Sequence, residues 1–326
     1  MTSNEHRNDS PPLVTAVIPA YNAERWIGAT LDSVQAQTYG ALEIIVVDDG
    51  SPDRGAEIVT ARSKEDPRIR LIRRENGGLS AARNTGIKAA SGEFVALVDA
   101  DDLWYATKIE RQVARFQKAR EEGLALGLVY CWSITVDEEG RPMKMGMSTS
   151  TAEGDVFRIL SRTNILSCGS SAMIPTQLAR ELGGYPEEMR SGCEDWAFHL
   201  RIARNHHFGV VPEELVGYRQ RQDSMSADLR FMLKGHQDAA EYLARHGCDL
   251  SPEDEKYQRL QVMAFSLIRT RVFAPRKLGS ALLEVLREDP WFLFRWTILG
   301  PLAIKAVLRR MTPSPKAAQG ASPDRS

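Results

Sequence analysis

The residue types that could do chemistry in this sequence begin with an acidic cluster. Asp99 and Asp101 flank Ala100, directly after the apolar segment EFVALV. Carboxylate oxygens are the preferred ligands of hard divalent cations such as Mg²⁺ and Mn²⁺, and such a cation neutralises a diphosphate well. Acidic clusters are also common as solvated turns or helix caps, so both interpretations are open for the cluster alone. Its place after an apolar strand favours a ligand site, because ligands of parallel sheets bind at the carboxyl ends of the strands.

A second acidic pair, Asp48 and Asp49, follows the apolar segment EIIVV and precedes Gly50 and Ser51. A carboxylate here could accept a hydrogen bond from a pyrimidine base or a ribose hydroxyl. Asp, Gly and Ser are equally common in turns, so a purely structural role explains the same residues. The pair alone does not decide between the two.

The third acidic pair, Glu194 and Asp195, begins a segment in which Trp196, His199 and Leu200 recur at helical spacing. We therefore expect both carboxylates in the first turn of a helix. The helix dipole favours ionised carboxylates at that position, which would be reason enough for them to be there. A carboxylate close to a substrate could also act as the general base that deprotonates a hydroxyl.

The elements that must position these residues are read from the alternation of apolar and amphipathic segments over about residues 13–98. The apolar segments LVTAVIPA, EIIVVDDG, IRLIRR and EFVALVD predict four strands, and the segments between them predict helices. Asn22 is expected to cap the first helix, and Ser51 to cap the second. This order predicts an α/β fold with a mostly parallel, Rossmann-type sheet and helices on both faces.

The remaining chain has a different texture. A strand is expected near LGLVYCWSITVD, another near 171–174, and a helix over about 193–205, before a mostly helical stretch begins. We divide the chain into a disordered N-terminus (1–11), an α/β domain (12–228), a helical module (229–311) and a disordered tail (312–326).

Net charge, cysteine spacing and the composition of the N-terminus exclude some classes of function and predict the cellular compartment. The 326 residues carry a formal net charge of −1, so no overall field attracts nucleic acid. The four cysteines form no CxxC pair, which favours reduced thiols in a cytoplasmic protein. The N-terminus is polar and predicts no secretory signal.

Several strings together identify a family. VIPAYNAERWIGATLDSVQAQTY, EIIVVDDGSPD and RRENGGLSAARNTGIKAASGEFVALVDADD follow one another in this order, and SCGSSAMIPTQLARELGGYPEEMRSGCEDWAFHLRIA continues through about Arg204. In order and spacing they resemble the family 2 glycosyltransferases of GT-A fold. The resemblance implies transfer of a sugar, with inversion, from a nucleotide-diphosphate sugar (a UDP-sugar first) to a hydroxyl of a glycan, lipid-linked or other acceptor.

The resemblance also implies roles for individual residues. Asp195 matches the catalytic base, Asp101 the direct metal ligand for Mg²⁺ or Mn²⁺, and Asp99 a second ligand near the ribose. Glu194 and Arg221 are expected at the phosphates or the acceptor. The expected contacts with the nucleotide sugar are Pro19, Ala20, Tyr21, Asn22, Glu24, Asp48, Arg73, Asn76, Arg83, Asp99 and Ala100.

The chain departs from the family's pattern at one position. Family members often have Tyr-Arg-x-His, whereas this sequence has Tyr218-Arg219-Gln220-Arg221. A third metal ligand with an imidazole is therefore in doubt, and the Arg221 guanidinium could instead balance the charge of a diphosphate.

Two alternatives to an active transferase are considered. A catalytically silent nucleotide-sugar-binding scaffold is disfavoured because Asp99, Asp101 and Asp195 are all present. A sugar-1-phosphate nucleotidyltransferase is disfavoured because no glycine- and lysine-rich phosphate loop lies near the first strand.

The C-terminal segment from Trp291 to Arg310 combines aromatic side chains with Arg295, Lys305 and Arg309. Such a helix could lie in a membrane interface, which would place the protein at the inner face of the cytoplasmic membrane. Packing against the α/β domain, or contact between two copies in a homodimer, explains the same composition. Pro301 interrupts the helix and favours the packed alternatives.

Overall fold

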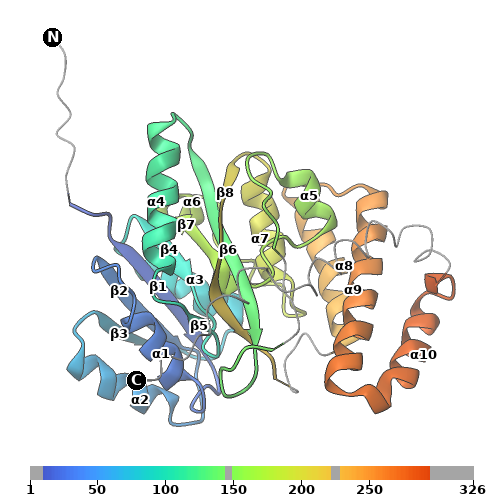
Figure 1. The fold of residues 1–326 in the computed structure, drawn as a ribbon, viewed down its shortest axis with the longest axis horizontal. Helices are drawn as coiled ribbons and strands as arrows, with labels where there is room; N and C mark the ends of the chain where they lie inside the picture. The colour runs from blue at the N-terminus through green and yellow to red at the C-terminus, as the bar shows by residue number, and fades with distance from the viewer. Residues whose placement is uncertain (1–9, 144–148, 222–227, 294–326) are drawn as a thin grey trace, which may run out of the picture.

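One mixed β-sheet runs through the molecule with helices on both faces (Figure 1). The structure is a computed structural model, and it describes residues 10–143, 149–221 and 228–293. Within them the strand order is β3-β2-β1-β4-β7-β6-β8-β5. The strands are β1 (Val14–Ala20), β2 (Leu42–Asp48), β3 (Ile69–Arg73), β4 (Phe94–Leu97), β5 (Leu103–Trp104), β6 (Leu126–Val136), β7 (Ala172–Pro175) and β8 (His207–Arg219).

The first four strands are parallel, as the alternation of segments predicts. β7 is antiparallel to both of its neighbours, β4 and β6, while β8 runs parallel to β6. Ala20 pairs with Asp48, and Asp48 pairs with Arg73. The polar residues that follow these strands therefore gather at one edge of the sheet.

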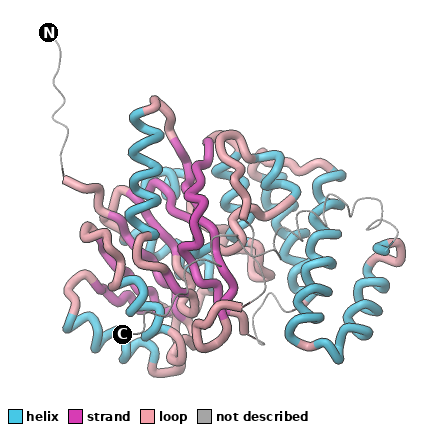
Figure 2. The backbone as a smooth tube through the Cα atoms, viewed as in Figure 1, coloured by secondary structure: helices cyan, strands magenta, loops and turns pink. Residues whose placement is uncertain are grey.

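Helices cover each face of the sheet, and Figure 2 shows the strands running between them. Alternate residues of β1 serve the two faces, with Ile18 in the cluster of α1, α2 and α4, and Val17 in that of α3, α6 and α7. The helices up to this point are α1 (Ile27–Gln35), α2 (Gly55–Glu65), α3 (Leu79–Ala89), α4 (Lys108–Glu121), α5 (Phe157–Arg162), α6 (Thr176–Glu181) and α7 (Glu194–Ala203). The expected α/β architecture is confirmed.

Two expected helix caps are wrong. The first helix begins at Ile27, and Asn22 instead has a left-handed backbone with φ of 52°. The second begins at Gly55, because Asp53 accepts a hydrogen bond from the Gly55 N–H while Ser51 bonds back to Asp48. Both loops are therefore longer than the cap signals suggest, which leaves more exposed backbone at the sheet edge.

Three further helices follow the sheet: α8 (Leu229–Arg245), α9 (Pro252–Phe273) and α10 (Leu278–Glu288). α8 packs on α7, and α9 packs on α8 and α5, as Figure 1 shows. Tyr242 and Leu243 of α8 belong to the same apolar cluster as α7. Gly235 is needed for this packing, since a Cβ there would lie 2.3 Å from the Ser191 carbonyl oxygen. The predicted domain boundary at residue 228 stays a prediction.

All four cysteines are buried free thiols, as the spacing predicts. Among the helices in the described ranges, none has an apolar stretch long enough to span a bilayer. The predicted N-terminal and C-terminal disordered segments and residues 294–310 lie outside those ranges.

Candidate active site

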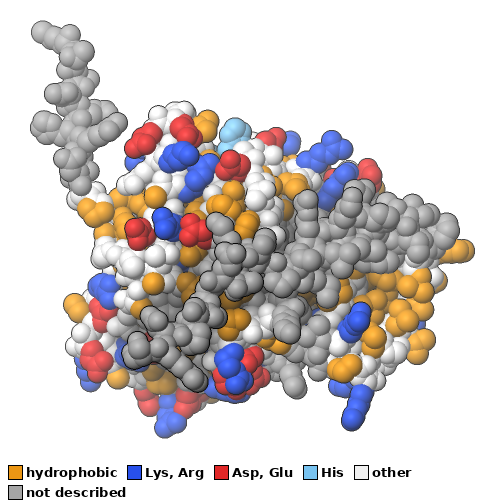
Figure 3. Space-filling view, viewed as in Figure 1, with side chains coloured by type: hydrophobic (Ala, Val, Ile, Leu, Met, Phe, Trp, Pro, Cys, Tyr) orange, Lys and Arg blue, Asp and Glu red, His pale blue; other side chains and the backbone are white. Residues whose placement is uncertain are grey.

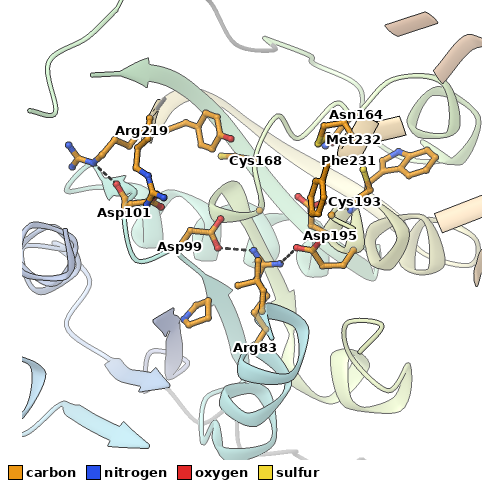
Figure 4. A pocket seen from close by; sticks show the side chains of 18 of the residues that line it. Arg83, Asp99, Asp101, Asn164, Cys168, Cys193, Asp195, Arg219, Phe231 and Met232 are labelled. Atoms are coloured by element: carbon orange, nitrogen blue, oxygen red, sulfur yellow. Dashed lines mark hydrogen bonds and ion pairs between the residues drawn. The ribbon is translucent and has the colours of Figure 1, made fainter. Parts of the chain in front are cut away.

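A cavity of about 660 Å³ lies at the edge where β1 and β4 end, and it extends as far as α8 and α9. Its lining includes Pro19 after β1, Asp99 after β4, Asp195 at the start of α7 and Phe265 in α9. Figure 4 shows Asp99, Asp195 and, from α8, Phe231 around one space. Segments far apart in the sequence thus contribute to a single site.

The loop that carries Asp99 and Asp101 is held by three hydrogen bonds with two other segments of the chain. The Thr30 hydroxyl of α1 donates to the carbonyl oxygens of Ala100 and Asp102, at 2.8 and 2.9 Å. The Asp99 N–H donates to the Ser170 hydroxyl at 3.0 Å. A loop held this way presents its carboxylates without having to reorganise, which is what electrostatic preorganisation requires.

Asp102 is the structural member of the cluster. Its side chain is fully buried and accepts hydrogen bonds from the Arg219 N–H and from the Ser170 hydroxyl. Burial raises the pKa of this carboxyl well above its ordinary value, and the neighbouring Asp101 and Asp99 charges add to the rise. Asp99 and Asp101, in contrast, line the cavity.

Asp101 is paired with the residue at which the sequence departs from the family pattern. Arg221 Nη1 donates to Asp101 Oδ2 at 3.0 Å (Figure 4). Burial raises the pKa of Asp101, the Asp99 carboxylate raises it further, and Arg221 opposes the rise. Arg219 supports the same loop, because its Nε donates to the Asp101 carbonyl oxygen at 2.6 Å.

Arg83 of α3 joins two of the acidic clusters. Its side chain is only 2% exposed, with Nη2 at 2.7 Å from Asp99 Oδ1 and Nη1 at 2.6 Å from Glu194 Oε1. A buried cation between two carboxylates is stabilising only when both partners stay in place. Arg83 therefore fixes the start of α7 relative to the end of β4, and Figure 4 shows it between Asp99 and Asp195.

Glu194 and Asp195 lie in the first turn of α7, as expected. Asp195 Oδ1 accepts a hydrogen bond from the Trp196 N–H at 2.7 Å, while Oδ2 accepts none from the described part of the chain. Burial raises the pKa of Asp195, and the charge of Arg83 opposes that rise. The result is a carboxylate with an unused oxygen that faces the cavity.

The backbone around the cavity is strained. Among the described residues, Asn22, Ser167 and Cys193 are the non-glycine residues with positive φ, and all three line the cavity. Each such conformation costs on the order of 1–3 kcal/mol and tends to be kept at functional sites. Cys193 is the residue immediately before α7, so its left-handed turn sets the direction from which Asp195 enters the cavity.

Asp48 and Asp49, the second acidic pair, have different surroundings. Asp48 is buried, accepts from the Ser51 N–H at 3.0 Å, and does not line the cavity. Asp49 lines it, and accepts from the N–H groups of Gly77 and Gly78 at 3.0 and 2.7 Å. This neighbour, which sequence reasoning left aside, holds the Gly77–Gly78 turn at the cavity edge.

Most of the predicted site residues come together in the cavity lining. Those that line it are Pro19, Ala20, Tyr21, Asn22, Asn76, Arg83, Asp99, Ala100, Asp101, Glu194, Asp195 and Arg221. Three do not: Glu24 forms an exposed pair with Arg54, and Arg73 and Asp48 pair with each other at 3.6 Å.

Sequence reasoning missed the residues that the C-terminal helices contribute. The α8 and α9 residues in the lining are Leu229, Phe231, Met232, His236, Gln258, Gln261, Val262, Phe265 and Ser266. No motif marks them. Their spacing on two helix faces was the available signal, and it is the same signal that a core-packing face gives.

Comparison with known proteins decides the family. The profile described as Glycosyl transferase family 2 matches residues 15–182, more than half of the chain. The chain belongs to this family. The match spans the region from β1 to α6, which carries Asp99, Asp101 and Arg83.

Curated relatives in this family match part of the chain. An uncharacterized glycosyltransferase of Rickettsia felis is 34% identical over 63% of this chain and 33% of its own length. The glycosyltransferase EpsJ of Bacillus subtilis is 49% identical over 34% of this chain and 30% of its own length. The matched region is about a third of the length of these relatives.

Solved structures share the GT-A fold. Staphylococcus aureus TarS 1–349, solved with UDP-GlcNAc, has a TM-score of 0.56 and 20% identity, covering 92% of this chain and 88% of the TarS 1–349 chain. The mannosyltransferase PcManGT of Pyrobaculum calidifontis, solved with GDP-Man and Mn²⁺, has a TM-score of 0.55 and 20% identity, covering 93% and 88%. Both extend the shared fold beyond the region that the family profile matches.

Proposed function

We propose that this chain is a hexosyl-type transferase that moves a sugar from a UDP-sugar to an acceptor hydroxyl with inversion at the anomeric carbon. The observation that carries the proposal is that one cavity contains two separate sets of carboxylates. Asp99 and Asp101 come from the end of β4, Asp195 comes from the start of α7, and Arg83 connects them. The leaving diphosphate needs its negative charge neutralised, and the attacking hydroxyl needs a base to take its proton. The two sets of carboxylates are placed to serve these two needs at two different points.

The proposed reaction is a single displacement. The acceptor oxygen forms a bond to the anomeric carbon as the bond from that carbon to the diphosphate oxygen breaks. The diphosphate leaves with the electron pair, and the acceptor proton passes to Asp195 Oδ2, which accepts no other hydrogen bond from the described chain. Arg219 and Arg221, both in the cavity lining, are the cations available to the diphosphate charge.

A divalent cation fits this site if the protein and the substrate both coordinate it. The described residues contain no cluster of three or more acidic, histidine or cysteine side chains that could hold a metal alone. Mg²⁺ and Mn²⁺ are commonly bound by one or two carboxylates together with substrate phosphates and water. Asp101 and Asp99 would hold the ion, which would supply Lewis-acid stabilisation of the leaving diphosphate. Asp101 must then release Arg221, with which it is paired.

The donor nucleotide is proposed with support from related folds. TarS is solved with UDP and with UDP-GlcNAc, whereas PcManGT is solved with GDP-Man. A screen should therefore compare UDP-glucose, UDP-galactose, UDP-GlcNAc and GDP-mannose, each with Mn²⁺ and with EDTA. We expect one UDP-sugar to raise the melting temperature in Mn²⁺ only, because a ligand that binds the native state alone stabilises it.

Turnover separates an enzyme from a silent scaffold. We expect slow release of UDP from the selected donor in the absence of acceptor, and faster release when an acceptor is present. Donor binding without any UDP release would support the scaffold alternative. Release of pyrophosphate from a nucleoside triphosphate and a sugar 1-phosphate would support the nucleotidyltransferase.

A further inference from the structure

The wall that α8 and α9 give to the cavity differs chemically from the rest of the site. On α9 the lining residues recur every three or four positions, so one helix face forms the wall: Gln258, Gln261, Val262, Phe265 and Ser266. On α8, Leu229, Met232 and His236 recur in the same way, and Phe231 lies beside them. These helices lie after the region that the family profile matches, residues 15–182.

This wall carries no charged group among the described lining residues. His236 packs against the Trp196 ring with the ring centroids 4.9 Å apart, and burial lowers its pKa to about 4, so the imidazole is neutral. The side chains of Arg219, Arg221 and Arg83 contact the acidic side of the cavity. The Arg221 carbonyl oxygen also accepts a hydrogen bond from Arg269 of α9 at 2.6 Å, so Arg221 marks the border of the neutral wall. An anionic group placed against α8 and α9 would lose its hydration without gaining a cation.

The wall does offer unused hydrogen-bonding groups. Gln261 and Ser266 lie at the cavity, and neither side chain makes a hydrogen bond within the described residues. His236 Nδ1 is likewise buried without a partner there. A buried polar atom without a partner is costly, so His236 Nδ1 indicates a place where a ligand's polar group can bind. Gln261 and Ser266 are partly exposed, and their side chains are open to a ligand in the cavity.

Apolar side chains surround these polar groups. Phe265 and Val262 come from α9, and Phe231, Met232 and Leu229 come from α8. Ligand sites typically combine an apolar and aromatic lining with a few placed polar groups that fix orientation. The hydroxyls of a sugar match Gln261 and Ser266, while the surrounding apolar surface matches an alkyl or aryl group attached to that sugar.

We propose that the acceptor bound against α8 and α9 is an uncharged glycoside whose alkyl or aryl aglycone packs on Phe265, Phe231 and Val262. This inference rests on the proposed function, since Asp195 must lie where the acceptor hydroxyl reacts. The aglycone selects the acceptor, and the sugar hydroxyls orient it toward Asp195. Acceptors with a phosphate on this part of the molecule are excluded by the neutral wall.

The test compares matched acceptors with the donor that the screen selects. Octyl and 4-nitrophenyl glycosides of glucose, galactose and N-acetylglucosamine are measured beside the free sugars and their 6-phosphates. For the sugar that is accepted, we expect KM for the glycoside at least about tenfold below that of the free sugar, and no turnover of the phosphate.

Variants test whether the α8 and α9 wall causes the preference for the glycoside over the free sugar. Phe265→Ala should bring the two KM values within about twofold of each other, Phe265→Leu should keep most of the difference, and Leu283→Ala, an exposed position on α10, should change nothing. Leu283→Ala should also leave KM for the donor and UDP release without acceptor unchanged, because Leu283 is exposed and does not line the cavity. The inference is overturned if the phosphate is used as well as the glycoside, or if Phe265→Ala keeps the ratio. Failure to bind or hydrolyse any donor would instead overturn the proposed function, and this inference with it.

Discussion

The two sides of the cavity are built on different physical principles. The side that follows the sheet is charged and held by short contacts, such as Arg83 with Asp99 and Glu194 at 2.7 and 2.6 Å. The side formed by α8 and α9 is neutral and includes Gln261 and Ser266, whose side chains have no partner within the described residues. A fixed charged side suits one recurring chemical step, whereas a neutral side can change with the acceptor.

The difference also explains how each side is held in place. Asp99 and Asp101 lie on a loop that is fixed by hydrogen bonds with Thr30 and Ser170. Arg83 and Asp195 lie on helices, and the pairs of Arg83 with Asp99 and Glu194 join these helices to that loop. The neutral wall depends on helix packing, with Gly235 letting α8 approach the loop before α7. Substitutions on the charged side should therefore change catalysis most, and those on the neutral side should change selectivity.

The largest effect is expected from Asp101→Ala on the charged side. The variant should lose transfer and most Mn²⁺-dependent stabilisation by the donor, because one of two proposed metal ligands is gone and the ion pair between Asp101 and Arg221 is lost. Transfer assays and thermal shifts with Mn²⁺ measure both. Activity of the unaltered enzyme that survives excess EDTA would contradict the metal assignment. Glu139→Ala, at an exposed side chain in the turn after β6, is the matched control.

A somewhat smaller effect is expected from Asp195→Asn. The amide keeps the shape and the hydrogen bond acceptor for the Trp196 N–H but cannot take a proton. We expect donor binding to be unchanged and kcat to fall by on the order of a hundredfold or more. Near-native turnover would assign the base to another residue.

The pH profile adds a second readout for Asp195. Because burial raises the pKa of this carboxyl and the base must be ionised, activity should fall as the pH drops through a pKa above the ordinary value for Asp of 3.8. The acid limb should disappear in the residual activity of Asp195→Asn. An acid limb that persists unchanged in the variant would report a different group.

The same contrast shows what the sequence could predict. Asp99 and Asp101 follow a clear strand pattern, so their place at the site follows from the rule that ligands bind where strand ends meet at one sheet edge. Asp195 begins a helix, and only the family resemblance placed it at the same site. Asp48 and Asp49 show the limit of that rule. Successive strand residues point to opposite sides, and a shift of one position decides which carboxylate lines the cavity.

The neutral wall could not be predicted in the same way. Val262 and Phe265 recur at the spacing of any core-packing helix face, and nothing in that pattern distinguishes a face that packs from one that lines a cavity. The expected contact of Arg83 with the nucleotide stays a prediction, and its buried pairs with Asp99 and Glu194 are a second role that joins residues far apart in sequence. Such pairings depend on tertiary packing, and a single sequence does not contain them as a local signal.

The smallest expected effect concerns the outer surface of the C-terminal helices, beyond the neutral wall. Leu283, Trp291 and Leu293 are 58%, 64% and 51% exposed, and Figure 3 shows hydrophobic side chains over this part of the molecule. Residues 294–310 continue the aromatic and basic composition in the sequence. We propose that this surface contacts the inner face of the cytoplasmic membrane peripherally; the homodimer stays a prediction.

Binding to anionic liposomes by sedimentation tests the membrane proposal. Phe292 is buried, so truncation after Leu293 is the better deletion, because it leaves that packing intact. We expect weak binding of the full chain that decreases with salt, since exposed charges are screened over about 8 Å at physiological ionic strength. Each basic group near an anionic surface contributes about 1 kcal/mol, so replacing Lys305, Arg309 and Arg310 with Gln should weaken binding by roughly a hundredfold.

A packed segment gives the opposite pattern: truncation lowers the melting temperature, and the full chain shows no liposome binding even at low salt. In that case residues 294–310 stabilise the protein by packing and not by binding lipid. The neutral character of the α8 and α9 wall would then serve the cavity alone and would not extend to a membrane surface.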